Sequence, residues 1–147
     1  MKACMMVLMV SLTALLGSCD SNKAEKFNSP LATVVKMNAA ESLMDFEEAE
    51  KYQDVDKIYS KFTKGDTVKP HDVWKEVVTS GNSMAAGKKF TNQLKYFNYD
   101  IAEKVNSLGA EVNLKAKSPG AEIQAIIYKL ELRNAGWTVV DIEYKNK

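Results

Sequence analysis

Cysteine, histidine and proline are scarce in this 147-residue sequence, and the scarcity excludes several classes of protein. The chain holds two cysteines, Cys4 and Cys19, a single histidine, His71, and three prolines. Structural zinc sites usually take four Cys or His ligands, so we expect no metal site, and no cofactor is predicted. The sequence also lacks a glycine-rich phosphate loop, a G-x-S-x-G nucleophile motif and a calcium-binding loop.

An excess of either charge is also missing. Twenty Lys and Arg residues face 19 Asp and Glu residues, and the formal net charge is +1. Proteins that bind nucleic acids carry a basic patch or stripe, and none is visible here, so we expect no nucleic-acid partner. No polybasic run is present to attract anionic lipids.

Charge is absent altogether from one stretch near the start of the chain. Lys2 precedes an uncharged run over residues 3–16. This run is shorter than the roughly 20 apolar residues that a membrane-spanning helix needs. A basic start, a short apolar run and then two small residues are typical of a signal peptide that is removed. The alternative is a buried apolar first helix that happens to contain a cysteine.

The end of this run carries a more specific motif. Leu16-Gly17-Ser18-Cys19 resembles the lipobox of bacterial lipoproteins: an aliphatic residue, two small residues and a cysteine. The resemblance implies cleavage before Cys19, then a diacylglyceryl thioether on the cysteine and acylation, as with palmitate, of its new amino group. It implies a domain outside the cytoplasm, anchored by lipid to the inner or outer membrane of the bacterial cell envelope. Residues 1–18 are then the signal peptide, 19–28 a lipidated tether and 29–147 one domain.

The first half of that domain is predicted to be helical. Ser29-Pro30 is a capping serine followed by proline at the first helical position. A second helical segment is expected over 44–62, where Asp45 can cap, and a loop over 64–70 precedes a third helix that carries Trp74. The motif over 80–83 weakens the end of that third helix.

The second half is predicted to be an antiparallel meander. Apolar and polar residues alternate along 110–117, which is typical of a sheet with one wet face. Turn motifs occur at 106–109, at 118–121, where proline and glycine fit a type II turn, and at 134–136, where glycine fits a bulged hairpin. The four strands expected lie within 95–105, 110–117, 121–133 and 137–145. The fold class is therefore α+β, with N-terminal helices packed in a curved four-stranded antiparallel sheet.

Three stretches together resemble a known superfamily. They are DFEEAEKY at 45–52, the helix with Trp74, and YKLELRNAGWTVVDIEY at 128–144. They are similar to the nuclear transport factor 2-like superfamily and, within it, to small cystatin-like lipoproteins of unknown function. The resemblance implies a cone-shaped domain with a pocket at its open end. That fold hosts isomerases, dehydratases, adaptors and pure binding domains, so it does not decide the function.

Candidate catalytic residues are few. Glu103 shares a strand face with Tyr99 and Ile101, and an inward carboxylate in an apolar pocket would have a raised pKa and could act as a base. A bulge or a strand end nearby would turn Glu103 outward. Asp141 is a similar candidate, whereas His71 is expected on the surface. We predict no catalytic site, and the alternative is a small hydrolase or isomerase that uses an inward carboxylate.

Aromatic residues and two isoleucines are the remaining candidates. Tyr99, Tyr128 and Trp137 line either a ligand cavity or the core, and Trp137 is expected to be largely buried against a helix. Tyr96, Phe97 and Tyr144 belong to the same aromatic set. Ile123 and Ile127 share a face with charged residues, which predicts either an interface, such as a homodimer, or scattered surface area. The function favoured is a non-catalytic lipoprotein that binds an unidentified protein or small molecule; an exposed patch without a pocket would instead indicate a protein that blocks a toxin or enzyme.

Overall fold

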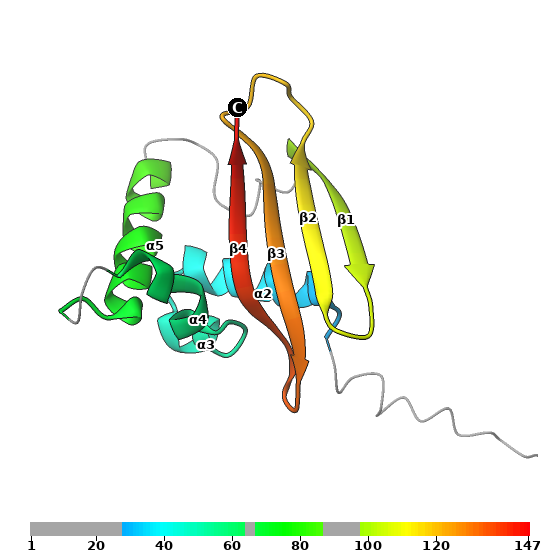
Figure 1. Cartoon of the computed structure of the whole chain (residues 1–147). Helices are drawn as coiled ribbons and strands as arrows, with labels where there is room; N and C mark the ends of the chain where they lie inside the picture. The colour runs from blue at the N-terminus through cyan, green and yellow to red at the C-terminus, as the bar shows by residue number, and fades with distance from the viewer. Residues whose placement is uncertain (1–27, 64–66, 87–97) are drawn as a thin grey trace, which may run out of the picture.

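The computed structural model describes residues 28–63, 67–86 and 98–147, with only the backbone described for 82–86 (Figure 1). The predicted signal peptide, Cys19, most of the tether, Tyr96 and Phe97 lie outside these residues. The elements are α2 (Pro30–Ser42), α3 (Phe46–Glu50), α4 (Val55–Tyr59), η1 (Ser60–Phe62), α5 (Pro70–Ala86), β1 (Tyr99–Val105), β2 (Ala110–Ala116), β3 (Ile123–Arg133) and β4 (Gly136–Asn146).

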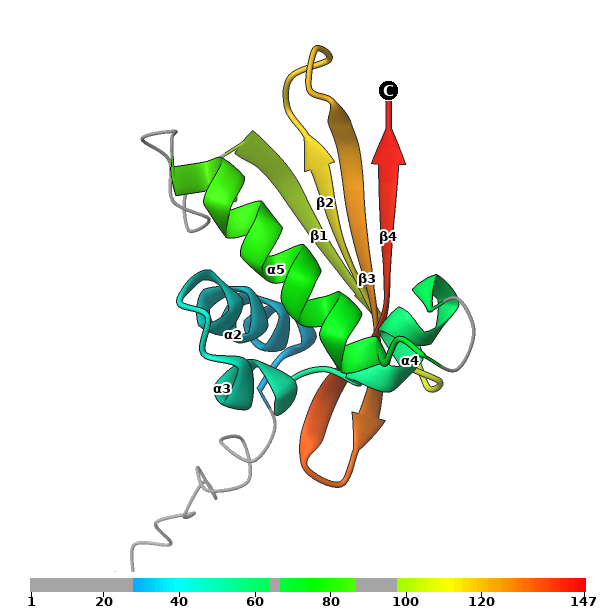
Figure 2. The same cartoon turned by 90° about the vertical axis from the view of Figure 1, so that its left-hand side faces the viewer.

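The described chain is an α+β fold with one antiparallel sheet, as predicted. The four strands lie in the order β1-β2-β3-β4, so the meander is confirmed. Figures 1 and 2 show α2 crossing one face of the sheet, which we call the inner face, with α5 beside it. α4 and η1 lie next to the edge of β4, and no described helix covers the outer face.

The helix starts follow from side-chain caps that the sequence predicts. The Ser29 hydroxyl accepts a hydrogen bond from the backbone N–H of Ala32 at 3.1 Å, and Pro30 opens α2. The Asp45 carboxylate accepts from the N–H of Glu48 at 3.1 Å and starts α3. Both caps satisfy N–H groups that have no partner within their own helix.

The helical segment expected over 44–62 is interrupted, and the sequence pattern did not predict this break. Asp54 caps a separate helix, α4, because the chain before it pairs with β4. The N–H of Asp54 donates to the carbonyl of Val139 at 2.8 Å, and the N–H of Val139 donates to the carbonyl of Tyr52 at 2.9 Å. These two bonds hold the backbone outside helical geometry and cover part of the β4 edge.

The core lies between the inner face of the sheet and the helices. In β2 the residues at 110, 112 and 114 are buried and alternate with more exposed ones, so the predicted alternation is confirmed. Trp74 of α5 is fully buried, and its ring meets Phe46 edge-on at a centroid distance of 5.2 Å. α5 also continues through the motif at 80–83, so that motif does not end the helix.

The three predicted turns are present, but one has a different geometry. The N–H of Asn106 donates to the carbonyl of Gly109 at 2.9 Å, and Gly136 has a φ of 125°. The turn at 118–121 is closed by a bond from the N–H of Ala121 to the carbonyl of Ser118, yet Gly120 has no positive φ. A type II turn requires one at that position, so the type II prediction is wrong; the Ser118 hydroxyl accepts from the N–H of Gly120 instead, at 3.3 Å.

Within the part of the chain that the structure describes, no helix is long and apolar enough to cross a membrane.

Candidate functional site

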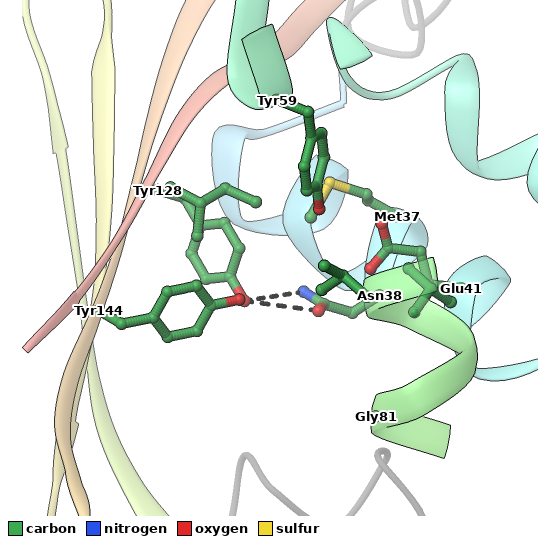
Figure 3. Close-up of a pocket in the computed structure, with 10 residues that line it drawn as sticks. Met37, Asn38, Glu41, Tyr59, Gly81, Tyr128 and Tyr144 are labelled. Carbon is green, nitrogen blue, oxygen red and sulfur yellow. Dashed lines mark hydrogen bonds between the residues drawn. The ribbon is translucent and has the colours of Figure 1, made fainter. Parts of the chain in front are cut away.

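A cleft opens between the inner face of the sheet and the helices α2, α4 and α5 (Figure 3). It consists of two neighbouring cavities that share four lining residues, and we name them the inner and the outer part. The inner part has a volume of about 180 Å³ and is lined by Met37, Asn38, Glu41, Tyr59, Val77, Val78, Gly81, Tyr128, Ile142 and Tyr144. The outer part has a volume of about 210 Å³ and is lined by Ile58, Tyr59, Phe62, Val73, Val77, Ile142 and Tyr144.

The inner part is polar along its α2 wall. The Asn38 side chain donates from Nδ2 to the carbonyl of Val34 at 2.8 Å and to the Tyr128 hydroxyl at 3.3 Å. Both Asn38 and Tyr128 are buried, and a buried polar group is costly unless it is hydrogen-bonded. The pair therefore fixes α2 against β3 at the floor of the cleft (Figure 3).

Glu41 lies one turn further along α2 and links this helix to α5 and to the segment between α3 and α4. Its Oε1 accepts hydrogen bonds from Nε2 of Gln53 and from Nε1 of Trp74, both at 2.8 Å. Sequence reasoning missed Asn38 and Glu41 as cleft residues. The sequence did contain a signal for them. Residues 34, 38 and 41 are spaced by four and three, so Asn38 and Glu41 lie on the same helix face as the buried Val34.

Two tyrosines bring hydroxyl groups to the same space. Burial raises the pKa of Tyr59, and the charge of Glu41 raises it further. The pKa of Tyr144 is also raised, first by burial of the ring where it enters the cleft and then by the charge of Glu41, although the residue as a whole is 58% exposed. Both phenols therefore keep their protons at neutral pH and can donate hydrogen bonds, and Figure 3 shows the Tyr144 ring extending from β4 into the cleft.

The outer part of the cleft, which we call its mouth, is lined mainly by apolar side chains. Phe62 is 57% exposed, Val77 52% and Tyr144 58%. Together with the half-buried Val73 they surround the outer part. The cleft thus grades from an apolar mouth to a floor with hydrogen-bonding groups, which is the arrangement of small-molecule sites.

Glu103 does not line this cleft, and its side chain is exposed rather than enclosed by apolar residues. The residue pairs with Val112 and so faces the inner side of the sheet, as its strand face predicts. However, β1 lies at the edge of the four described strands. Its Oε2 accepts a hydrogen bond from the N–H of Leu31 at 2.7 Å, so the carboxylate caps the first turn of α2 and stabilises that positive helix end.

Asp141 also differs from the expected inward base. It lies opposite Lys129 in the β3–β4 register, and its carboxylate contacts Lys61 at 2.6 Å and Lys129 at 3.3 Å. The hydrogen bond from Lys61 is the main cause that holds the pKa of Asp141 below its usual value, and Lys129 adds to it. A general base near neutral pH needs a raised pKa, so these contacts do not favour that role for Asp141.

The three aromatic candidates have different positions. Tyr128 lines the inner part of the cleft, whereas Tyr99 is half-buried at the margin of the core. Trp137 is partly buried and packs against the hydrophobic core, so the expectation that it is largely buried is met in part. It is the second residue of β4 and lies opposite Leu132, next to the turn between β3 and β4.

The exposed isoleucine pair predicted on β3 is not present. Ile127 is only 6% exposed although it lies on the outer face. Its register neighbours are Asn113 on β2 and Glu143 on β4, so it has a strand neighbour on each side. Ile123 packs against the core, because the register shifts between Ile123 and Ala125 and turns it to the other face.

His71 is half-exposed and lies outside the cleft. Its Nε2 is 2.8 Å from Glu50, and its Nδ1 is 3.5 Å from Asp56, so it links the start of α5 to α3 and α4. Among the described residues, no three His, Cys, Asp or Glu side chains converge as a metal site would require.

Comparisons with models of protein families, with curated proteins and with solved structures found no match to this chain. The motif at Cys19 and the geometry of the cleft are therefore what a functional proposal can rest on.

Proposed function

We propose that this protein is a lipid-anchored lipoprotein of the bacterial cell envelope, whose domain binds a small amphipathic molecule in the cleft. The anchor is proposed from Leu16-Gly17-Ser18-Cys19. The binding role is carried by one observation, the gradation of the cleft from an apolar mouth to a hydrogen-bonding floor. We also propose that the domain is nuclear transport factor 2-like, with its sheet wrapped as a cone around the helices.

The volumes of the cleft limit the ligand. An apolar cavity of about 150 Å³ holds a single benzene ring, and drug-sized ligands occupy about 300–1,000 Å³. The two parts, of about 180 and 210 Å³, therefore suit one ring or a short alkyl chain each. The ligand proposed has an apolar portion over Phe62 and Val77 and a polar group directed at Asn38 and the hydroxyls of Tyr59 and Tyr144.

The positions of the carboxylates favour binding over catalysis. Glu103 and Asp141 are engaged with a helix end and with lysines outside the cleft. Glu41 is the carboxylate among the described cleft residues, and its Oε1 already accepts two hydrogen bonds. These contacts give each carboxylate a structural partner.

The anchor is tested by metabolic labelling with palmitate. Cys19→Ala should abolish labelling and leave unprocessed precursor, because the thioether and the new amino group both belong to this residue. Cys4→Ala is the matched control and should label normally, since Cys4 lies in the segment that is removed. Labelling that persists in Cys19→Ala would overturn the lipoprotein proposal.

The cleft is tested with the neutral fluorescent probe N-phenyl-1-naphthylamine. Val77→Asp places a charge at the apolar mouth and should weaken probe binding at least tenfold. Val35→Asp is the control, because Val35 is also a partly exposed helical valine, at 39%, but does not line the cleft. Equal affinities in the two variants, or no saturable binding to the wild type, would contradict the proposed site.

A further inference from the structure

Large apolar side chains are exposed at the ends of two neighbouring hairpins. Leu108, in the turn between β1 and β2, is 91% exposed, and Val105 just before that turn is 56% exposed. Leu132, at the end of β3, is 55% exposed and lies opposite the half-buried Trp137. Exposed side chains of this size cost free energy in water, and a cluster of them marks an interaction surface.

These residues belong to one surface. A groove of about 290 Å³ lies between the two hairpins and is lined by Asn106, Ser107, Leu108, Gly109, Glu131, Leu132, Arg133 and Trp137. Figure 1 shows both hairpin ends at the same end of the sheet, opposite the turn at 118–121. We call this surface, with Val105 added, the hairpin end.

The chain enters the domain beside the hairpin end. The N–H of Leu31, in the first turn of α2, donates to Glu103, which is two residues before Val105. Figure 1 shows the start of α2 toward the same end of the sheet as the two hairpins. Residues 19–28 would then join the lipid on Cys19 to this side of the domain. At about 3.3–3.6 Å per residue, such a tether spans about 30–35 Å at most.

The hairpin end has no evident charge, among its described residues, that would attract a partner surface. Arg133 contacts Asp54 at 2.7 Å and Glu131 at 3.4 Å. Lys104 lies opposite Glu111 in the register of β1 and β2. Arg133, the cation among the described residues of the hairpin end, is thus paired with two carboxylates, so the surface is suited to contact through its apolar side chains. Trp is also a residue favoured where an apolar phase meets water.

We propose that the hairpin end contacts the bilayer to which Cys19 is anchored, with the exposed Leu108 and Leu132 inserted at the level of the lipid headgroups and Trp137 beside them at the margin of the core. This inference rests on the proposed lipid anchor. The lipid implied for Cys19 carries more than one acyl chain and is enough to hold the membrane, so the contact is not needed for retention. The contact would instead fix the orientation of the domain, with the turn at 118–121 directed away from the membrane.

The experiment places one fluorophore at either end of the molecule. Ser107→Cys and Ser118→Cys are matched because both serines are exposed residues in hairpin turns. In the lipidated mature chain the introduced cysteine is the sole thiol, since Cys4 is removed and Cys19 is a thioether. Each variant is labelled with NBD, purified with its lipid, and reconstituted into phosphatidylcholine vesicles that contain doxyl-labelled lipid.

NBD at position 107 should shift to shorter wavelength and be quenched by the doxyl lipid, whereas NBD at 118 should emit as it does in water. The quenching should persist at high salt, because screening acts on charges. Leu108→Asp, combined with the label at 107, should reduce it. Each of these results would support membrane contact through apolar residues.

Three outcomes would overturn the inference. Protein that floats with vesicles while both labels emit as in water would refute the contact and leave the anchor intact. A blue shift at 107 that depends on protein concentration in detergent, without vesicles, would identify a second copy as the occupant. Purified protein that lacks the mass of the lipid would refute the anchor itself, and the inference would fall with it.

Discussion

The two tryptophans of the domain allow one substitution to be compared in two environments. Trp74 is fully buried, whereas Trp137 is half-buried at the hairpin end. The indole N–H of Trp74 donates to Glu41 at 2.8 Å, and phenylalanine cannot make this bond. Trp74→Phe should therefore destabilise the domain far more than Trp137→Phe.

The magnitude follows from the contacts that are lost. A hydrogen bond to a charged group contributes about 1.5–3 kcal/mol, and the space left by the smaller ring costs about 1 kcal/mol more. Trp74→Phe should thus lower the free energy of unfolding by about 2.5–4 kcal/mol, against a typical total of about 5–15 kcal/mol. Trp137→Phe leaves its site open to water and should cost less than about 1 kcal/mol.

Urea denaturation followed by far-ultraviolet circular dichroism measures both losses without using tryptophan fluorescence. The proteins compared are the wild type and the two variants, each without the leader and with Cys19→Ser to remove the lipid. Equal losses in the two variants would refute the assignment of Trp74 to the core and of Trp137 to the surface. A small loss for Trp74→Phe would show that Glu41 contributes little through this bond.

Two further predictions concern the sheet. Gly109→Ala should cost about 1–3 kcal/mol by thermal denaturation, because a Cβ there would lie 2.5 Å from the carbonyl oxygen of Leu130, whereas Gly120→Ala meets nothing closer than 3.7 Å and should be near neutral. Asp141→Asn should cost less than about 1 kcal/mol at pH 7. The pKa of Asp141 in the folded state is lowered, chiefly by Lys61, so the stabilisation from this carboxylate is present above the unfolded pKa of about 3.9 and is lost as the pH falls through the folded pKa. The stability difference between Asp141→Asn and the wild type should therefore vanish in acid. A difference that grows in acid would contradict the ion pair.

Local signals in the sequence were sufficient for much of the fold. The caps at Ser29 and Asp45 depend on a side chain and an N–H three residues apart, so the sequence contains both partners. Alternation along 110–116 likewise depends on a period of two within one strand. These features need no knowledge of distant residues, and the structure confirms them.

Features set by distant residues could not be predicted in the same way. The helical periodicity of 44–62 is real, but pairing with Val139 breaks it. Ile127 is buried between register neighbours on two other strands. Glu103 is exposed on β1, which has one partner among the described strands. The cleft has the same origin, since Asn38 and Glu41 become its floor only when β3, β4 and α5 surround α2.

The bonds between Val139 and the chain at Tyr52 and Asp54 have a consequence for the order of folding. They join segments more than eighty residues apart along a chain of 147, and Val139 and Ile142 of β4 belong to the core. A nascent chain that lacks β4 therefore cannot close its core or fix the break between α3 and α4, since such distant contacts form late. For a protein that is exported as proposed, this delay keeps the chain unfolded, and so able to cross the membrane, until β4 has been synthesised.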